Sequence, residues 1–157
     1  MTLAPDGKTA PLVVSHGSNV GGQFSPDGHM VAYVSDETGR DEVYLRSVAK
    51  PEDAVPVSSD GGAEPRWSPD GKELFYRRGS AFLATSVNSS GALSVGEPRK
   101  LCDLAAAWGR NPNHAGYAVS PDGKRFLILR PDPRAIPTQI NVVLNWFEEL
   151  RTKVPTR

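Results

Sequence analysis

The tetrapeptide Ser-Pro-Asp-Gly occurs three times in this chain of 157 residues, and each copy lies between two short apolar segments. The copies begin at Ser25, Ser68 and Ser120. Proline presets φ for a tight turn, aspartate hydrogen-bonds nearby backbone N–H groups, and glycine supplies a positive φ. Each copy therefore predicts a strand, a tight turn and a second strand. We interpret the aspartates of the motif as turn residues, not as catalytic or metal-binding groups.

The spacing of the three turns predicts the architecture. Units of about 40–50 residues with four short strands each are typical of propeller blades. We expect blades at residues 19–58, 61–101 and 113–145. Strands in the second unit are expected at 64–67, 73–77, 81–87 and 94–101. The first unit is expected to have strands at 23–24, 29–35, 42–48 and 54–58. The third unit shows three clear strands, the last over 139–144, and no convincing fourth.

Three stretches of sequence carry a resemblance to a known family. These are WSPDGKELFY at 67–76, SDETGRDEVYL at 35–45 and INVVLNWFEEL at 140–150. The pattern resembles TolB-like, WD-repeat-like β-propeller repeats, and is most similar to the C-terminal propellers of some bacterial serine/threonine kinases. The resemblance covers nearly the whole chain and implies the fold, while propellers host many functions. No Gly-rich nucleotide loop and no His-Arg-Asp catalytic loop occurs in the sequence.

We therefore expect an all-β chain whose three four-stranded blades form half of a six-bladed β-propeller. The chain is a single incomplete domain over 1–157, with a short C-terminal helix and tail at 146–157. Residues 8–15 form a lone strand that completes another blade. Because propellers close with four to eight blades, we expect a homodimer that closes the ring. In that dimer Leu12, Val13 and Val14 contact the partner's third blade near 142–144.

The composition excludes several classes of protein. Eighteen basic and eighteen acidic residues balance, which argues against a nucleic-acid-binding surface. No segment approaches 18 apolar residues, so we expect no membrane-spanning helix. The N-terminus lacks the apolar core of a signal peptide, and we expect a cytoplasmic location, although related propellers are often extracytoplasmic. Cys102 is the only cysteine, so no internal disulfide forms, and we expect it to be a small, partly buried residue.

A ligand is expected at the central channel of the propeller. Alignment of the repeats on the turn serines places Gln23 and Arg66 at equivalent positions on the inner strands, and Glu64 two residues before Arg66. His114 lies in a loop just ahead of the third inner strand. We expect these four residues to surround a small molecule or a peptide.

A calcium ion is the alternative occupant of the channel. Calcium accepts carboxylate and amide oxygens in flexible geometry, and Glu64 and Asn113 are the candidate ligands. Some six-bladed propellers are lactone hydrolases with a channel calcium, which polarises a carbonyl and activates water. The lack of cysteine pairs and of His-x-x-x-His argues against zinc. The catalytic residues are unknown. Ser15 and His16 are adjacent, and adjacent residues in a strand point to opposite faces, so their adjacency is poor evidence for a catalytic pair.

The sequence leaves three functions open. The first is a propeller module that binds a small molecule or peptide at its channel. The second is a calcium-dependent hydrolase of lactones or similar esters. The third is a detached fragment of a larger sensor protein. No catalytic set is visible in the sequence, which favours the first.

Overall fold

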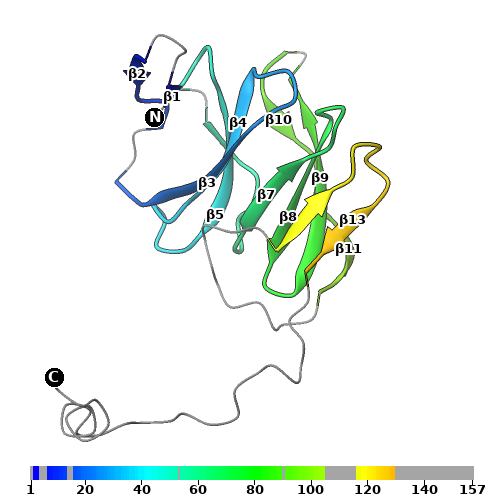
Figure 1. Cartoon of the computed structure of the whole chain (residues 1–157). Coiled ribbons are helices and arrows are strands. Elements are labelled where there is room, and N and C mark those ends of the chain that lie inside the picture. Colours follow the sequence, from blue (N-terminus) through cyan, green and yellow to red (C-terminus); the bar gives the residue numbers. More distant parts are fainter. Residues whose placement is uncertain are drawn as a thin grey trace, which may run out of the picture.

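The computed structural model describes residues 2–3, 7–13, 16–52, 54–89, 91–104 and 116–129. In these residues the chain is all-β: its strands form several antiparallel sheets that do not close into a barrel, and none of the described residues is helical. The expected all-β class is therefore confirmed for the described part. Three of the sheets follow one another in sequence order, each built around one Ser-Pro-Asp-Gly turn (Figure 1). The expected strand at 139–144 and the expected helix at 146–157 lie outside the described residues.

The first sheet has four strands in sequence order. They are β3 (Asn19–Phe24), β4 (Met30–Ser35), β5 (Glu42–Ser47) and β6 (Ala54–Pro56). Neighbouring strands are antiparallel, so the order β3-β4-β5-β6 needs only hairpin connections. Four strands were expected here, and all four occur within a few residues of the expected positions.

The second sheet also follows sequence order, but its outer edge is divided. Its strands are β7 (Ala63–Trp67), β8 (Glu73–Arg78), β9 (Ala81–Asn88), β10 (Ser94–Val95) and β11 (Arg99–Asp103). Both β10 and β11 pair with β9, where one strand over 94–101 was expected. Pro98 interrupts the edge because it has no N–H to donate. The Thr85 hydroxyl donates to the Gly96 carbonyl at 2.6 Å inside the break.

Cys102 lies on β11 and is exposed, which corrects the expectation of a partly buried residue. The correction follows from the position of β11 at the edge of its sheet. Leu101 packs against the apolar cluster beside the third sheet, while the register of β11 against β9 shifts between Lys100 and Cys102 and leaves Cys102 exposed.

The third sheet and the N-terminal segment are smaller. Strands β12 (Tyr117–Val119) and β13 (Phe126–Ile128) form a hairpin. Residues 8–15 were expected as a lone strand that completes another blade, and the structure describes residues 8–13 of them. Here β2 (Thr9–Ala10) pairs with β1 (Thr2–Leu3) of the same chain. Leu12 is buried against the face of the first sheet that carries Tyr33 and Tyr44.

The three Ser-Pro-Asp-Gly turns have the same hydrogen bonds. In the second copy, the Ser68 hydroxyl donates to the Asp70 carboxylate at 2.7 Å and accepts the Glu73 N–H at 2.9 Å. The Gly71 N–H donates to the Ser68 carbonyl at 3.0 Å. The serine hydroxyl and the aspartate have the same partners in the turns at 25 and 120. The positive φ expected for the turn glycines is confirmed at 75°, 71° and 69° for Gly28, Gly71 and Gly123.

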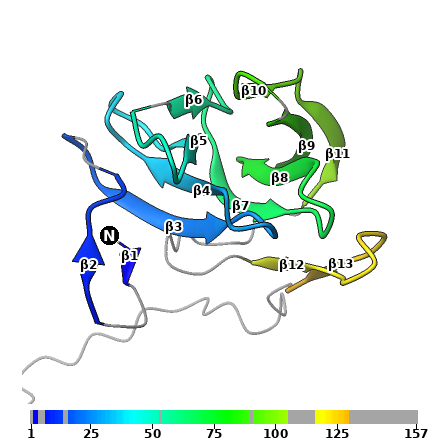
Figure 2. The same cartoon turned by 90° about the horizontal axis from the view of Figure 1, so that it is seen from above.

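Apolar side chains fill the space between successive sheets. A first cluster joins the first and second sheets and includes Val34, Leu45, Trp67, Leu74 and Tyr76. A second cluster joins the second and third sheets. In it the ring of Phe126 meets those of Phe75 and Phe82 edge-on, and Tyr117 meets Phe82 in the same way. The second sheet is therefore covered on both faces. In Figure 2 the first strands β3, β7 and β12 lie toward one side of the molecule, and β6, β10 and β11 lie toward the other.

Prediction for the turn serines. We expect Ser68→Ala to lower the free energy of unfolding by about 1–3 kcal/mol, because it leaves the Glu73 N–H, which is partly buried, without its acceptor. Ser120→Ala removes the same bonds in a more exposed turn, where water can replace them, and is expected to cost less. Urea unfolding of both variants measures the difference. Equal losses would contradict the argument that burial sets the cost.

Prediction for acid stability. The pKa of Asp70 lies below its ordinary value of 3.8, chiefly because the Ser68 hydroxyl donates to the carboxylate, and next because the Lys72 N–H does. A lowered folded-state pKa stabilises the fold above the unfolded pKa, and this stabilisation is lost as pH falls below about 4. Asparagine does not titrate, so the Asp70→Asn variant does not lose this stabilisation as the pH falls. The difference in free energy of unfolding between the native chain and the variant should therefore become smaller from pH 5 to pH 3. Urea titrations at several pH values measure both free energies of unfolding. A difference between the two proteins that stays constant with pH would contradict the prediction.

Candidate functional site

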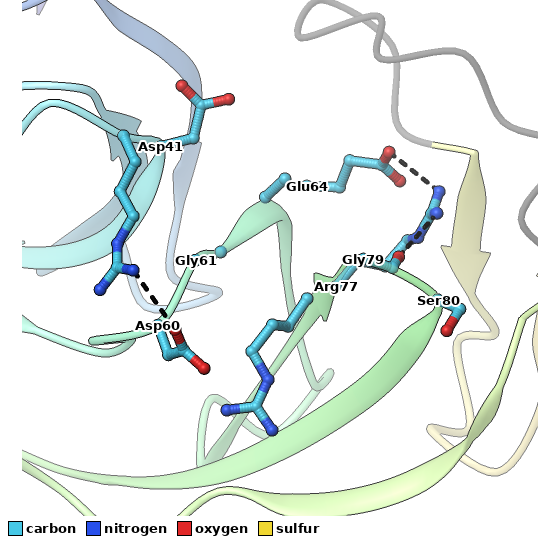
Figure 3. Close-up of a pocket in the computed structure, with 11 residues that line it drawn as sticks. Asp41, Asp60, Gly61, Glu64, Arg77, Gly79 and Ser80 are labelled. Atoms are coloured by element: carbon cyan, nitrogen blue, oxygen red, sulfur yellow. Dashed lines mark hydrogen bonds and ion pairs between the residues drawn. The ribbon is translucent and has the colours of Figure 1, made fainter.

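A pocket lies where the first and second sheets meet, at the ends of their strands. It has a volume of about 490 Å³ and is lined by polar and charged residues and by three glycines. They come from the loop after β4, the connection from β6 to β7, and the turn between β8 and β9. The lining residues are Arg40, Asp41, Asp60, Gly61, Gly62, Ala63, Glu64, Arg77, Arg78, Gly79 and Ser80. Figure 3 shows Asp41 and Asp60 on one side of this pocket, with Glu64, Gly79 and Ser80 on the other.

A buried glutamate fixes the first wall of the pocket. Glu42, at the start of β5, accepts hydrogen bonds from Arg40 Nε at 2.6 Å and from the Gly61 N–H at 2.9 Å. Its second oxygen accepts the Ser58 hydroxyl. Arg40 also reaches Asp60 at 3.3 Å and the Ser59 carbonyl. A buried carboxylate is tolerated when its charge and lone pairs are satisfied in this way. The network therefore holds the connection between the first and second sheets in one position.

Glu64 fixes the second wall and ties the second sheet to the third. Its Oε1 accepts Arg77 Nη1 at 3.2 Å, and its Oε2 accepts the Gly116 N–H at 3.0 Å. The Tyr117 hydroxyl donates to the Glu64 carbonyl at 2.7 Å. Burial raises the pKa of Tyr117, so this hydroxyl keeps its proton as a donor. Arg77 also donates to the Gly79 carbonyl at 3.0 Å, which orients the turn that forms the pocket rim.

The backbone of Glu64 has an unusual conformation. Its φ is 58°, and among the described residues it is the one non-glycine residue with positive φ. The register of β7 against β8 shifts between Ala63 and Arg66, which marks a bulge. The first sheet has the equivalent shift between Val20 and Gln23, and there Gly21 has a φ of 67°. The left-handed conformation costs a residue with a Cβ about 1–2 kcal/mol, so the contacts of the Glu64 side chain offset this strain.

The structure places the residues expected at the channel at different sites. Glu64 lines the pocket, while Gln23 lines a separate groove of about 280 Å³ on the outer face of the first sheet. The Gln23 carbonyl accepts Trp67 Nε1 at 3.2 Å. Arg66 lies on β7 and donates to the Pro65 carbonyl at 2.9 Å. His114 and Asn113 lie outside the described residues, so their placement stays a prediction.

Sequence reasoning missed most of the pocket. It considered positions on the first strand of each repeat, whereas the pocket is lined chiefly by the ends of other strands and by loops. The sequence contained a signal for these residues in the connections between strands. Connections that reach the same end of the first two sheets contain Gly and charged residues: Gly-Arg-Asp at 39–41, Asp-Gly-Gly at 60–62 and Arg-Arg-Gly-Ser at 77–80. The missed residues of the site are Arg40, Glu42, Asp60, Arg77, Arg78 and Ser80.

The donor set at Glu64 does not fit a calcium ion. Both of its carboxylate oxygens already accept hydrogen bonds from Arg77 and Gly116, and a cation there would lie beside the Arg77 guanidinium. In the part of the chain that the structure describes, no group of three or more His, Cys, Asp or Glu side chains is placed to hold a metal. The second candidate ligand, Asn113, falls outside that part.

Three groups at the pocket are available to a ligand. Arg78 and Ser80 are exposed, and neither side chain has a hydrogen-bond or ion-pair partner among the described residues. Asp60 is also exposed and uses one oxygen toward Arg40. A guanidinium and a hydroxyl donate to a carboxylate, and an aspartate accepts from an amine. The pocket lining therefore supplies donors for a carboxylate and an acceptor for an amine.

A scan against protein-family models and a search of curated proteins found no match to this chain. No helix among the described residues has the length and apolarity needed to cross a membrane.

Prediction for Glu64. Glu64→Ala keeps the strained φ and removes the carboxylate, so Arg77 loses its partner, and we expect a loss of about 3 kcal/mol in the free energy of unfolding. Glu64→Gly removes the same carboxylate but relaxes the backbone, as Gly21 does in the first sheet. It should therefore be about 1 kcal/mol more stable than the alanine variant. Denaturant unfolding compares the two. An alanine variant as stable as the glycine variant would show that position 64 is not strained.

Proposed function

We propose that the chain is a TolB-like β-propeller module that binds a small polar molecule or a peptide. The propeller architecture is supported by three observations. One turn motif occurs three times, hairpins connect the strands of the first two sheets in sequence order, and apolar side chains pack between consecutive sheets. Each sheet then corresponds to one blade. The packing of sheet on sheet through alternating side chains is the arrangement that such repeats need in order to bury their cores.

The observation that carries the binding function is the pair of unpartnered donors at the pocket. Arg78 and Ser80 face solvent at the rim, while the neighbouring Arg40 and Arg77 are held by Glu42 and Glu64. The walls are thus fixed before any ligand arrives, which lowers the entropy cost of binding. The ligand's carboxylate binds Arg78 and Ser80, and its amine or amide N–H binds Asp60. A free peptide terminus or an amino acid has these groups.

Prediction for binding. Free dipeptides, their C-terminal amides and their N-acetylated forms are tested by ligand-observed NMR and titration calorimetry. We expect the free acids to bind more tightly than the amides. Arg78→Ala should weaken binding of the acid about tenfold or more, because a hydrogen bond to a charged group contributes about 1.5–3 kcal/mol. The affinity for the amide should stay unchanged in the same variant.

Arg125→Ala is the matched control, because Arg125 is an exposed arginine on the third sheet away from the pocket. It should bind like the native chain. Equal affinity for acid and amide, or an Arg78→Ala variant that still prefers the acid, would contradict the proposed site. Absence of binding across the whole panel would exclude peptide termini as its ligands.

A further inference from the structure

The three sheets are covered unequally. The second sheet is covered on both faces, by the first sheet on one side and by the third on the other. The first sheet has a face turned away from the second, on which Val31, Tyr33 and Tyr44 are covered by Leu12 and Val13. The third sheet has a face turned away from the second, to which Leu127 belongs. Each end of the row therefore presents a sheet face without a neighbouring sheet among the described residues.

Equivalent positions of the repeat show what these end faces lack. Phe24 and Trp67 both precede the turn serine, and Trp67 is 8% exposed between the first two sheets while Phe24 is 56% exposed. Phe75 and Leu127 both follow the turn serine by seven residues. Phe75 is 3% exposed between the second and third sheets, and Leu127 is 67% exposed. The end faces thus keep the apolar residues that the internal interfaces bury.

A hollow lies next to Phe24 and another next to Leu127, each lined by residues of both faces of its sheet. The groove on the first sheet is lined by Leu12, Val20, Phe24 and Val31 among others. The hollow on the third sheet is lined by Ala118, Val119, Phe126 and Leu127 among others. The large exposed hydrophobic residues of the described part are Phe24, Leu127 and Leu129, and they lie on the end sheets or directly after β13. Apolar exposure concentrated on two opposite faces is typical of an interaction surface.

We propose that a second copy of this chain covers these faces, with the outer face of its third sheet packed on the outer face of the first sheet around Phe24, beside Leu12 and Val13. The occupant follows from the repeat. Inside one chain, the face that carries Trp67 packs on the preceding sheet, and the face that carries Phe75 packs on the following sheet. The face with Phe24 is equivalent to the Trp67 face, which packs on a preceding sheet. The face with Leu127 is equivalent to the Phe75 face, which packs on a following sheet. Two copies therefore join head to tail, by contacts of the kind that join the sheets within one chain.

A head-to-tail contact either closes a ring or extends into a filament. Three sheets per chain make six in a dimer, which lies within the four to eight blades of closed propellers. The closure at two copies rests on the proposed propeller architecture, whereas the head-to-tail contact itself rests on the two end faces. The two claims can fail separately. The mass of the assembly tests closure at two copies, and the pairing of variants tests the head-to-tail contact.

The experiment uses the full chain and measures its mass by light scattering after size exclusion. We expect twice the chain mass of 16.9 kDa for the native protein. Phe24→Asp and Leu127→Asp each place a charge in both contacts of the ring, so each alone should be monomeric. An equimolar mixture should regain dimers, because one contact then joins two unchanged faces. Ala92→Asp, at an exposed turn away from both faces, should remain dimeric.

Each of the other outcomes overturns one named claim of the proposal. A native chain that is monomeric at all concentrations overturns the second copy, and leaves residues 130–157 of the same chain as the occupant to examine. Single variants that stay dimeric overturn the assignment of the faces. A mixture without dimers, with both variants folded by circular dichroism, overturns the head-to-tail arrangement. Native assemblies larger than a dimer support the contact and overturn closure at six sheets.

Discussion

The central strands of this chain are apolar on both faces, and each of its sheets therefore needs a neighbour on each side. Along β4 successive side chains point alternately toward the second sheet and toward Leu12 and Val13, and all six residues are buried. Along β8 they point alternately toward the first and the third sheet, and the three central residues are buried. A strand buried on both faces cannot stabilise a sheet that stands alone. The stacking of sheets, the position of the pocket and the exposed end faces all follow from this requirement. The turn motif contributes by fixing the register, since a shift of one residue would exchange the two faces.

The stacking leaves the strand ends as the place for polar chemistry. Side chains between the sheets are apolar, so charged groups gather where loops from adjacent sheets meet. Glu42 and Glu64 show how this edge is made rigid: each carboxylate joins an arginine to a backbone N–H of the next connection or sheet. These contacts cross between consecutive repeats. They consequently stabilise the stack and shape the pocket with the same bonds.

The sequence predicted the parts of the fold that depend on local chemistry. The turns at Ser25 and Ser68 and the strands around them follow from proline, aspartate and glycine geometry within a few residues. The divided edge strand was missed although Pro98 stands at the break in the sequence. The close approach of Gly96 to Ser86, where an added Cβ would be 2.3 Å from the hydroxyl oxygen, is visible only in the folded sheet. The site was only partly predicted. Glu64 was recognised from its place in the repeat, while Arg40, Asp60 and Arg78 come together only when loops of two sheets meet.

The strain at Glu64 links these observations. At the equivalent bulge of the first sheet the chain has Gly21, which adopts a positive φ without cost. Gly21 has no side chain to hold the following sheet, and the contact from the first sheet to the next connection is made by Glu42, which accepts the Gly61 N–H. At Glu64 a sheet lies on each side, and the bulge aims its carboxylate at Gly116 of the third sheet and at Arg77. A glycine would relax the backbone but would leave Arg77 without its carboxylate and the third sheet without this tie. The residue at the bulge is thus set by the contact between sheets, at the expense of local backbone geometry.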